Sequence, residues 1–184
     1  MTCIVGYIDK ENDKIIMGGD SAGVAGLDII SRKDTKVFIK DNKFIMGFTT
    51  SFRMGQILHY MPLVIEEQAS YEDDMSFMVK KFIPAVIELF KKNWGEMKNS
   101  NGEIKGGCFL VGYKNKLYQI ESDYQVSENN LNYCSVGCGY SYAMSALKTL
   151  EDIDMSAKDK VLKSLEIAEF FSCGVRSPFN ILEF

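Results

Sequence analysis

A threonine follows Met1 directly, and its hydroxyl is the nucleophile on which this sequence could found a hydrolytic reaction. A methionine before so small a residue is normally trimmed, which would give Thr2 a free α-amine. That amine has an ordinary pKa of roughly 7.7–8.0, so a useful fraction is neutral near pH 7. It could take the hydroxyl proton, directly or through a water molecule, while Oγ attacks a carbonyl carbon. The reaction would also require a nearby cation, a carboxylate that holds this cation, and backbone N–H groups for the oxyanion.

The sequence lacks the residues required for three other kinds of site: a histidine-activated nucleophile, a metal centre and a nucleotide-binding loop. His59 is the single histidine, and we expect it at the boundary of a helix whose core face carries Leu58 and Met61. A multi-histidine metal site is therefore excluded and zinc is unsupported, so we expect no metal and no cofactor. The glycines at 18–26 and 137–139 match neither a phosphate-binding loop nor a dinucleotide fingerprint.

Composition is typical of a globular protein. The 184 residues suffice for a single domain, 1–184, with 46% hydrophobic and 25% charged residues. A net charge of −4 without a basic stripe argues against a nucleic-acid partner. No apolar run approaches the roughly 20 residues of a membrane span, and we expect no secretory signal. The five cysteines form no C-x-x-C pair, which indicates reduced thiols and a cytoplasmic protein; they are Cys3, Cys108, Cys134, Cys138 and Cys173.

Strands are predicted around the positions that could carry chemistry. Alternating apolar residues predict a first strand at 1–8, which places Thr2 at its start. A polar turn at 9–13 leads to a returning strand, and the small residues at 18–23 are expected to break that hairpin. The further strands are predicted at 14–17, 35–39, 44–49, 108–113, 116–121, 132–136 and 178–184.

Helices are predicted in two pairs. Apolar residues at helical spacing predict them at 52–68, 72–98, within 137–150, and at 157–171. Ser51 and Ser156 are the expected N-caps, Pro84 is expected to kink the second helix, and 98–107 to form a loop. Strands, two helices, strands, two helices and a strand favour an α+β fold. Two sheets packed face to face, with a helix pair on each outer face, would bury every apolar face.

Three short stretches in the N-terminal half resemble proteasome β-subunits. They are IMGGDSAG at 16–23, DTKVF at 34–38 and FIMGFTTS at 44–51. They are particularly similar to HslV, the bacterial proteasome-like peptidase that works with the unfoldase HslU. In that family a G-D/E motif supplies a carboxylate sixteen residues before the catalytic lysine, which corresponds here to Asp20 and Lys36. Lys33 is a competing cation, but Lys36 fits the family pattern better.

The resemblance implies further site residues. Gly47 stands where the family's A-G motif supplies an oxyanion-hole amide. In SVGCGYSYA, at 135–143, Cys138 takes the place of a serine that lies near the threonine amine. A thiol is a poorer hydrogen-bond partner than that hydroxyl. Ser177 and Asn180 occupy the acidic and serine positions of the family's R-D-x-x-S motif.

The resemblance also implies a fold and an activity. The fold would be that of the N-terminal-nucleophile hydrolases, a four-layer αββα sandwich of two antiparallel sheets between helix layers. The activity would be that of a threonine-type peptidase subunit in a homo-oligomeric ring, fed with unfolded polypeptide by an AAA+ unfoldase. One alternative is an inactive proteasome-like structural or interaction subunit, which retention of Met1 would favour. The other is an amidase of the same fold that acts on small substrates.

Overall fold

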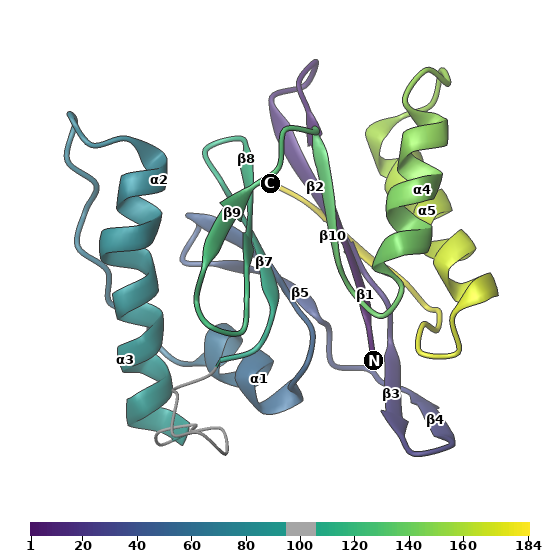
Figure 1. Ribbon diagram of the computed structural model, residues 1–184, viewed down its shortest axis with the longest axis horizontal. Helices are drawn as coiled ribbons and strands as arrows, with labels where there is room; N and C mark the ends of the chain where they lie inside the picture. Colours follow the sequence, from purple (N-terminus) through teal and green to yellow (C-terminus); the bar gives the residue numbers. More distant parts are fainter. Residues whose placement is uncertain (95–105) are drawn as a thin grey trace.

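Two antiparallel sheets pack face to face between two layers of helices in the computed structural model, which describes residues 1–94 and 106–184 (Figure 1). The first sheet has the strand order β10–β1–β2–β11, and the second has the order β5–β6–β7–β8–β9. The prediction of a four-layer α+β fold is therefore confirmed. The strands of the first sheet are β1 (Cys3–Asp9), β2 (Lys14–Gly19), β10 (Tyr133–Gly137) and β11 (Asn180–Glu183), and those of the second are β5 (Val37–Lys40), β6 (Phe44–Phe48), β7 (Phe109–Tyr113), β8 (Lys116–Ile120) and β9 (Val126–Glu128).

Strand β1 is apolar at successive positions because both of its faces are covered. Ile4 belongs to the cluster between the two sheets, together with Ile45 and Leu110. Cys3 and Val5 point the other way, into the cluster beneath the helix pair α4 (Tyr140–Leu150) and α5 (Ala157–Phe171). A strand buried on both faces is a continuous apolar run. Thr2, immediately before this strand, is thus fixed by one of the most enclosed elements of the fold.

The second sheet is covered on its outer face by α1 (Phe52–Tyr60), α2 (Asp74–Phe77) and α3 (Ile83–Trp94). The predicted helix at 52–68 ends early, at Tyr60. Pro62 is the reason: the residue before a proline avoids the helical region, and Met61 is extended, with φ −87° and ψ 142°. The predicted caps are present, since Ser51 Oγ accepts from Met54 N and Ser156 Oγ accepts from Asp159 N.

The predicted helix at 72–98 begins at Asp74, two residues late, and contains a π-helical turn, Met78–Phe82, just before Pro84. Proline lacks the N–H that would continue the α-helical ladder, so the irregularity expected at Pro84 is this wider turn. Asp73 caps the start through its contact with Ser76 N. The end of this predicted helix and most of the predicted loop at 98–107 lie outside the described residues.

Two features of the strands differ from the sequence prediction. Strand β2 continues through Gly19, where a side chain would collide with Val37 and Ile4, so this glycine serves sheet packing and not a turn. After it the chain forms an additional hairpin, β3 (Ala22–Ala25) and β4 (Asp28–Ser31), with Leu27 fully exposed near its tip. Neither this hairpin nor the short β9 was predicted, since their residues contribute little to the core and carry no clear alternation.

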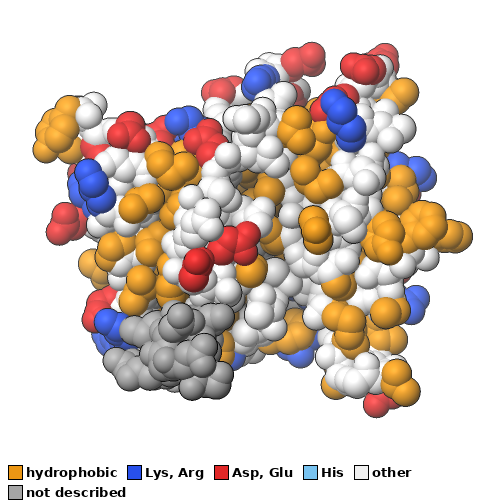
Figure 2. All heavy atoms as spheres, viewed as in Figure 1, with side chains coloured by type: hydrophobic (Ala, Val, Ile, Leu, Met, Phe, Trp, Pro, Cys, Tyr) orange, Lys and Arg blue, Asp and Glu red, His pale blue; other side chains and the backbone are white. Residues whose placement is uncertain are grey.

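Hydrophobic side chains also gather on the outer surface over α4 and α5 (Figure 2). Phe170 is 82% exposed and Phe171 is 61% exposed. Their rings are 5.0 Å apart, and Tyr142 of α4 stacks on Phe171 at 5.5 Å. Among the described helices, none is both long enough and apolar enough to reach across a lipid bilayer.

Candidate active site

Thr2 lies just before β1, beside the turn that joins β10 to α4 (Figure 1). It is only 4% exposed. The antiparallel pairing of Ile4 with Gly19 brings the end of β2 alongside, so that Asp20 N donates to Cys3 O at 3.2 Å. Three segments distant in the sequence thus meet around one threonine: the N-terminus, the end of β2 and the residue that precedes β5.

Lys36 links Thr2 to Asp20. Its Nζ lies 3.1 Å from Thr2 Oγ1 and 2.9 Å from Asp20 Oδ1. The side chains of the lysine and the aspartate have no exposed surface at all. Lys36 is held by its main chain too, since its carbonyl accepts from Phe48 N at the end of β6. The structure therefore brings together three residues that the resemblance had placed at one site.

Asp20 is fixed by more than its lysine. Its Oδ1 accepts from Cys3 N at 2.9 Å, and its Oδ2 accepts from Ala22 N at 2.8 Å and Arg176 N at 3.3 Å. These amides belong to the first strand, to β3 and to the segment before β11. A carboxylate with this many donors has no freedom to turn away, so Asp20 holds Lys36 at a defined distance from the hydroxyl.

Burial lowers the pKa of Lys36 below its usual range, because the charged ammonium loses its hydration. The neighbouring Asp20 carboxylate acts in the opposite direction and favours the charged form. The ring of Phe52 lies 5.7 Å from Nζ and completes the enclosure. The result is a cation beside the Thr2 hydroxyl in a site from which water is excluded, where electrostatic interactions are strong.

Cys138 lies on the other side of Thr2. Thr2 N donates to Cys138 Sγ at 3.3 Å, and Sγ donates to Thr2 O at 3.4 Å. The turn that carries it requires glycine at 137, where φ is +101° and a side chain would overlap Thr2 O. Ser172 Oγ is 3.6 Å from the same sulfur. The thiol therefore has the position, next to the threonine nitrogen, that the resemblance assigned to it.

Gly47 does not reach the site, which corrects the assignment of its amide as an oxyanion donor. It lies within β6, paired with Val37 on one side and Leu110 on the other. Thr49 N donates to Cys108 O on the β7 side. Amides two residues apart in a strand point the same way, so the Gly47 N–H faces β7. Its lack of a side chain serves packing, because a Cβ would sit 2.4 Å from Ile4 Cγ2.

Thr50, which sequence reasoning missed, lies closer to Thr2. It lines the small hollow beside Thr2 that Met1 and residues 48–52 enclose. Its φ is +73°, a left-handed conformation that is a genuine outlier for a β-branched residue. Within residues 1–94 and 106–184, its N–H has no hydrogen-bond acceptor. The only sequence signal was its place, just after a strand and just before the Ser51 cap.

The remaining sequence candidates lie away from Thr2. Ser177 bonds to Glu169, its hydroxyl at 3.1 Å from Oε1, and Asn180 is in β11 with its amide at 3.5 Å from Val37 O. Lys33 is exposed. His59 stacks between Phe38 and Tyr60, and burial lowers its pKa. The segment between α5 and β11 reaches the site through Ser172 Oγ, 3.6 Å from Cys138 Sγ, and through the Arg176 amide, which donates to Asp20 Oδ2.

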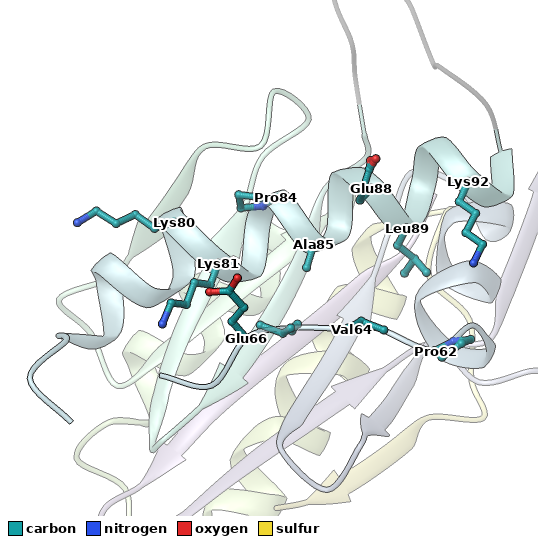
Figure 3. Close-up of a pocket in the computed structure, with 11 residues that line it drawn as sticks. Pro62, Val64, Glu66, Lys80, Lys81, Pro84, Ala85, Glu88, Leu89 and Lys92 are labelled. Atoms are coloured by element: carbon teal, nitrogen blue, oxygen red, sulfur yellow. The ribbon is translucent and has the colours of Figure 1, made fainter. Parts of the chain in front are cut away.

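Larger hollows lie outside this cluster. One of about 300 Å³ shares Phe48 with the hollow beside Thr2, and its wall includes the ion pair of Arg32 and Asp34. Another, of about 510 Å³, is a groove between the extended segment 62–66 and α3, with Lys80, Glu88 and Lys92 at its rim (Figure 3). None of the residues in contact with Thr2 lines that groove. Among the described residues, no three His, Cys, Asp or Glu side chains are grouped so as to hold a metal ion.

Solved structures with the same fold are peptidases of the proteasome-like kind. No protein-family profile matches the sequence. BPH from Thiobacillus denitrificans, in complex with epoxomicin, superposes with a TM-score of 0.80 at 13% identity, over 100% of this chain and 98% of that one. HslV from Trypanosoma brucei gives 0.68 at 15% identity, over 99% and 98% of the two chains. The Gly-1 mutant of Anbu from Hyphomicrobium sp. strain MC1 gives 0.66 at 14% identity, over 100% and 82%. The chain therefore has the fold that the resemblance implied.

Proposed function

We propose that this chain is a proteasome-like threonine peptidase subunit whose nucleophile is Thr2 after removal of Met1. One observation carries the proposal: a buried lysine held by a buried aspartate lies 3.1 Å from the threonine hydroxyl. An isolated buried ion pair is weak evidence for stability. A buried cation aimed at a hydroxyl at the end of a central strand has a clear use in catalysis, because it stabilises negative charge that develops on Oγ.

Each residue has a distinct part in the proposed reaction. Once the peptide bond to Met1 is cleaved, the Thr2 nitrogen is a free amine and accepts the Oγ proton. Oγ then bonds to the carbonyl carbon of the substrate, and the protonated amine returns its proton to the leaving nitrogen. A water molecule, deprotonated by the same amine, releases the acyl group from Oγ. Lys36 stabilises the charge on Oγ throughout, Asp20 holds Lys36, and Cys138 positions the amine.

The oxyanion requires a donor other than Gly47. We assign this role to the amide of Thr50, which borders the hollow beside Thr2. The unusual φ of Thr50 supports the assignment, since backbone strain of this kind concentrates where function needs a particular amide direction. The flanking amides are committed elsewhere: Thr49 N donates to Cys108 O, and Ser51 N donates to Thr49 O.

Substrate and assembly follow from the same proposal. The substrate would be a peptide or unfolded polypeptide, and the subunits would form a homo-oligomeric ring in the cytoplasm, fed by an AAA+ unfoldase. The exposed aromatic cluster of Tyr142, Phe170 and Phe171 supports association, because contiguous apolar surface of this kind is unusual on a monomer.

Intact mass and N-terminal sequencing, followed by a threonine-directed electrophile, test the proposal. We expect the mature chain to begin at Thr2 and to gain one adduct on that residue, whereas Thr2→Ala gains none. Peptide hydrolysis should disappear in Thr2→Ala and fall by at least a hundredfold in Lys36→Ala, a loss of the size that is typical of single electrostatic groups at such sites. A chain that keeps Met1 and forms no adduct would contradict the proposal and favour an inactive subunit.

A further inference from the structure

The β3–β4 hairpin projects from the end of the first sheet, on the far side of the molecule from α3 (Figure 1). Leu27 near its tip is fully exposed, and Ile30 is 60% exposed. Gly26 forms the turn with φ of +61°, and a Cβ placed on it would have no neighbour within 4 Å. A two-stranded ribbon without cover is only marginally stable in water, so this hairpin gains from a surface that encloses its tip.

The groove beside α3 is a concave surface of matching size and polarity. Its volume of about 510 Å³ lies within the range of roughly 300–1,000 Å³ that is usual for sites that enclose a ligand. Pro62 and Val64 on the extended segment face Ala85 and Leu89 on α3 (Figure 3). Val64 is 87% exposed in the single chain. The groove is therefore open and apolar enough to receive an apolar side chain such as that of Leu27.

The backbone along one wall of this groove is open too. Residues 63–66 lie in an extended segment, and within 1–94 and 106–184 none of their N–H groups donates a hydrogen bond. In the described part of the chain, β3 and β4 pair only with each other, so each has one edge without a neighbouring strand. Extended backbone with unpaired N–H groups is a template for another strand. The groove therefore fits a β-hairpin better than a helix.

The charges of the two surfaces are complementary. Asp28 follows the leucine at the tip and is the only charged residue of the hairpin, 22–31. Lys92 extends from α3 toward Pro62 at one end of the groove, whereas Glu88 points away from the extended segment (Figure 3). With the leucine between the apolar walls, the Asp28 carboxylate can meet the Lys92 ammonium at the rim, where opposite charges favour one orientation of the hairpin.

We propose that the β3–β4 hairpin of one copy of this chain docks into the groove between 62–66 and α3 of the next copy. The inference rests on the assembly that is part of the proposed function, and it assigns the two surfaces that a ring requires. Because the hairpin and the groove are different surfaces on opposite sides of the molecule, the contact is heterologous and repeats from subunit to subunit until the ring closes. Docking also restrains the root of the hairpin, where Ala22 N donates to Asp20 Oδ2 at 2.8 Å.

Single substitutions on each surface test the contact in the mature protein. Leu27→Asp at the tip and Val64→Asp in the groove should each reduce the native mass, by light scattering, to that of one chain, because each places a charge in an apolar contact. Both side chains are exposed in the single chain, so urea denaturation should show wild-type stability. Tyr71→Asp is the matched control: it adds the same charge at a side chain that is 92% exposed and outside both surfaces, and it should keep the wild-type mass.

Mixing the two variants distinguishes a heterologous contact from a symmetric one. Leu27→Asp keeps an intact groove and Val64→Asp keeps an intact hairpin, so the mixture can form one contact and no further one. It should sediment as a pair of 20.8 kDa chains, whereas each variant alone stays single. A charge reversal gives a second test: Asp28→Lys and Lys92→Asp should each raise at least threefold the concentration at which half of the subunits are assembled, and the double variant should reverse most of that rise.

The outcomes separate this inference from the proposed peptidase activity, since none of the masses depends on turnover. An oligomer that survives Leu27→Asp and Val64→Asp overturns the contact, as does a mixture that forms no pairs or a wild-type protein that is a single chain. Dissociation in Phe170→Asp without dissociation in Leu27→Asp also overturns it, because the aromatic cluster over α4 and α5 would then hold the subunits. A protein that assembles as expected but forms no adduct on Thr2 overturns the proposed peptidase alone.

Discussion

Lys36 and Asp20 show how a costly arrangement of side chains becomes useful. Removing two charges from water is expensive, and a hydrophobic pair of similar volume is often at least as stable. Here the aspartate receives three backbone N–H groups besides the ammonium. Its geometry is therefore set by the main chain of three segments. The ammonium of Lys36, by contrast, has only Asp20 and the Thr2 hydroxyl within hydrogen-bonding distance among the described residues, so the position of Nζ depends on the carboxylate.

This difference predicts unequal costs of substitution. Asp20→Ala should lower the free energy of unfolding by about 3–5 kcal/mol, because a buried ammonium and three amides lose their partner. Lys36→Met should cost less, since the carboxylate keeps its backbone donors. Urea denaturation of both variants measures the order. A Lys36→Met protein that is less stable than Asp20→Ala would show that the ion pair, and not the amides, fixes Asp20.

The lowered pKa of Lys36 predicts the pH dependence of the reaction. Activity should rise with pH as the Thr2 amine loses its proton, around its ordinary pKa of roughly 7.7–8.0. It should then fall as Lys36 loses its charge. Because burial lowers the pKa of Lys36, the alkaline limb should lie below 10.5, the value of an exposed lysine. A pH profile of kcat/KM checks this, and activity that stays flat up to 10.5 would contradict the role of the charge.

At the scale of elements, β6 and the turn after it explain what the sequence could and could not predict. The glycine in FIMGFTTS looked like the oxyanion residue because an isolated motif does not specify which way an amide points. That direction depends on the register with β5 and β7. Likewise the residue type of Thr50 does not indicate its backbone φ of +73°, because the connection from β6 into α1 imposes this conformation. The sequence could indicate Asp20, Lys36 and Cys138 because their positions along the chain match the motifs of the family that it resembles. The distances between their side chains, in contrast, depend on how the sheets pack.

Gly47 should therefore behave as a packing residue. In Gly47→Ala the new methyl group would lie between the sheets, against Ile4 and Met17. We expect a loss of about 1–3 kcal/mol in the free energy of unfolding, as is usual for an overfilled core. Hydrolysis per folded molecule should stay within twofold of the wild type. A stable Gly47→Ala protein with a tenfold lower kcat would instead return the oxyanion role to this residue.

The conformation of Thr50 gives a second test at this scale. Thr50→Ala and Thr50→Gly both lack the hydroxyl that accepts from Cys108 N, so their difference isolates the backbone. Glycine adopts positive φ without strain. The free energy of unfolding of Thr50→Gly, measured by urea denaturation, should therefore be about 1 kcal/mol higher than that of Thr50→Ala. Both variants should keep their activity because both keep the backbone amide of residue 50. Elsewhere alanine is the more stabilising of the two, so the reverse order would mean that residue 50 carries no strain.

At the scale of the whole molecule, the layered architecture buries both faces of each sheet but leaves aromatic surface over α4 and α5. The sequence predicted the layers well because their apolar periodicity must match the fold. It predicted poorly the features that the core does not specify, such as the β3–β4 hairpin. The sequence did not predict the groove beside α3 either. One side of this groove is the extended segment that follows α1, which ends before Pro62.

The proposed ring predicts a specific oligomeric state for the native protein. A ring requires a heterologous interface that closes on itself, so every subunit presents two different surfaces. The native mass by light scattering should then be a multiple, larger than two, of the 20.8 kDa chain. Thr2→Ala should give the same mass, since it changes only a buried hydroxyl at the site. If the mature protein hydrolyses peptides at full rate as a monomer, the ring is not needed for the chemistry, and an amidase of the same fold that acts on small substrates becomes the better description.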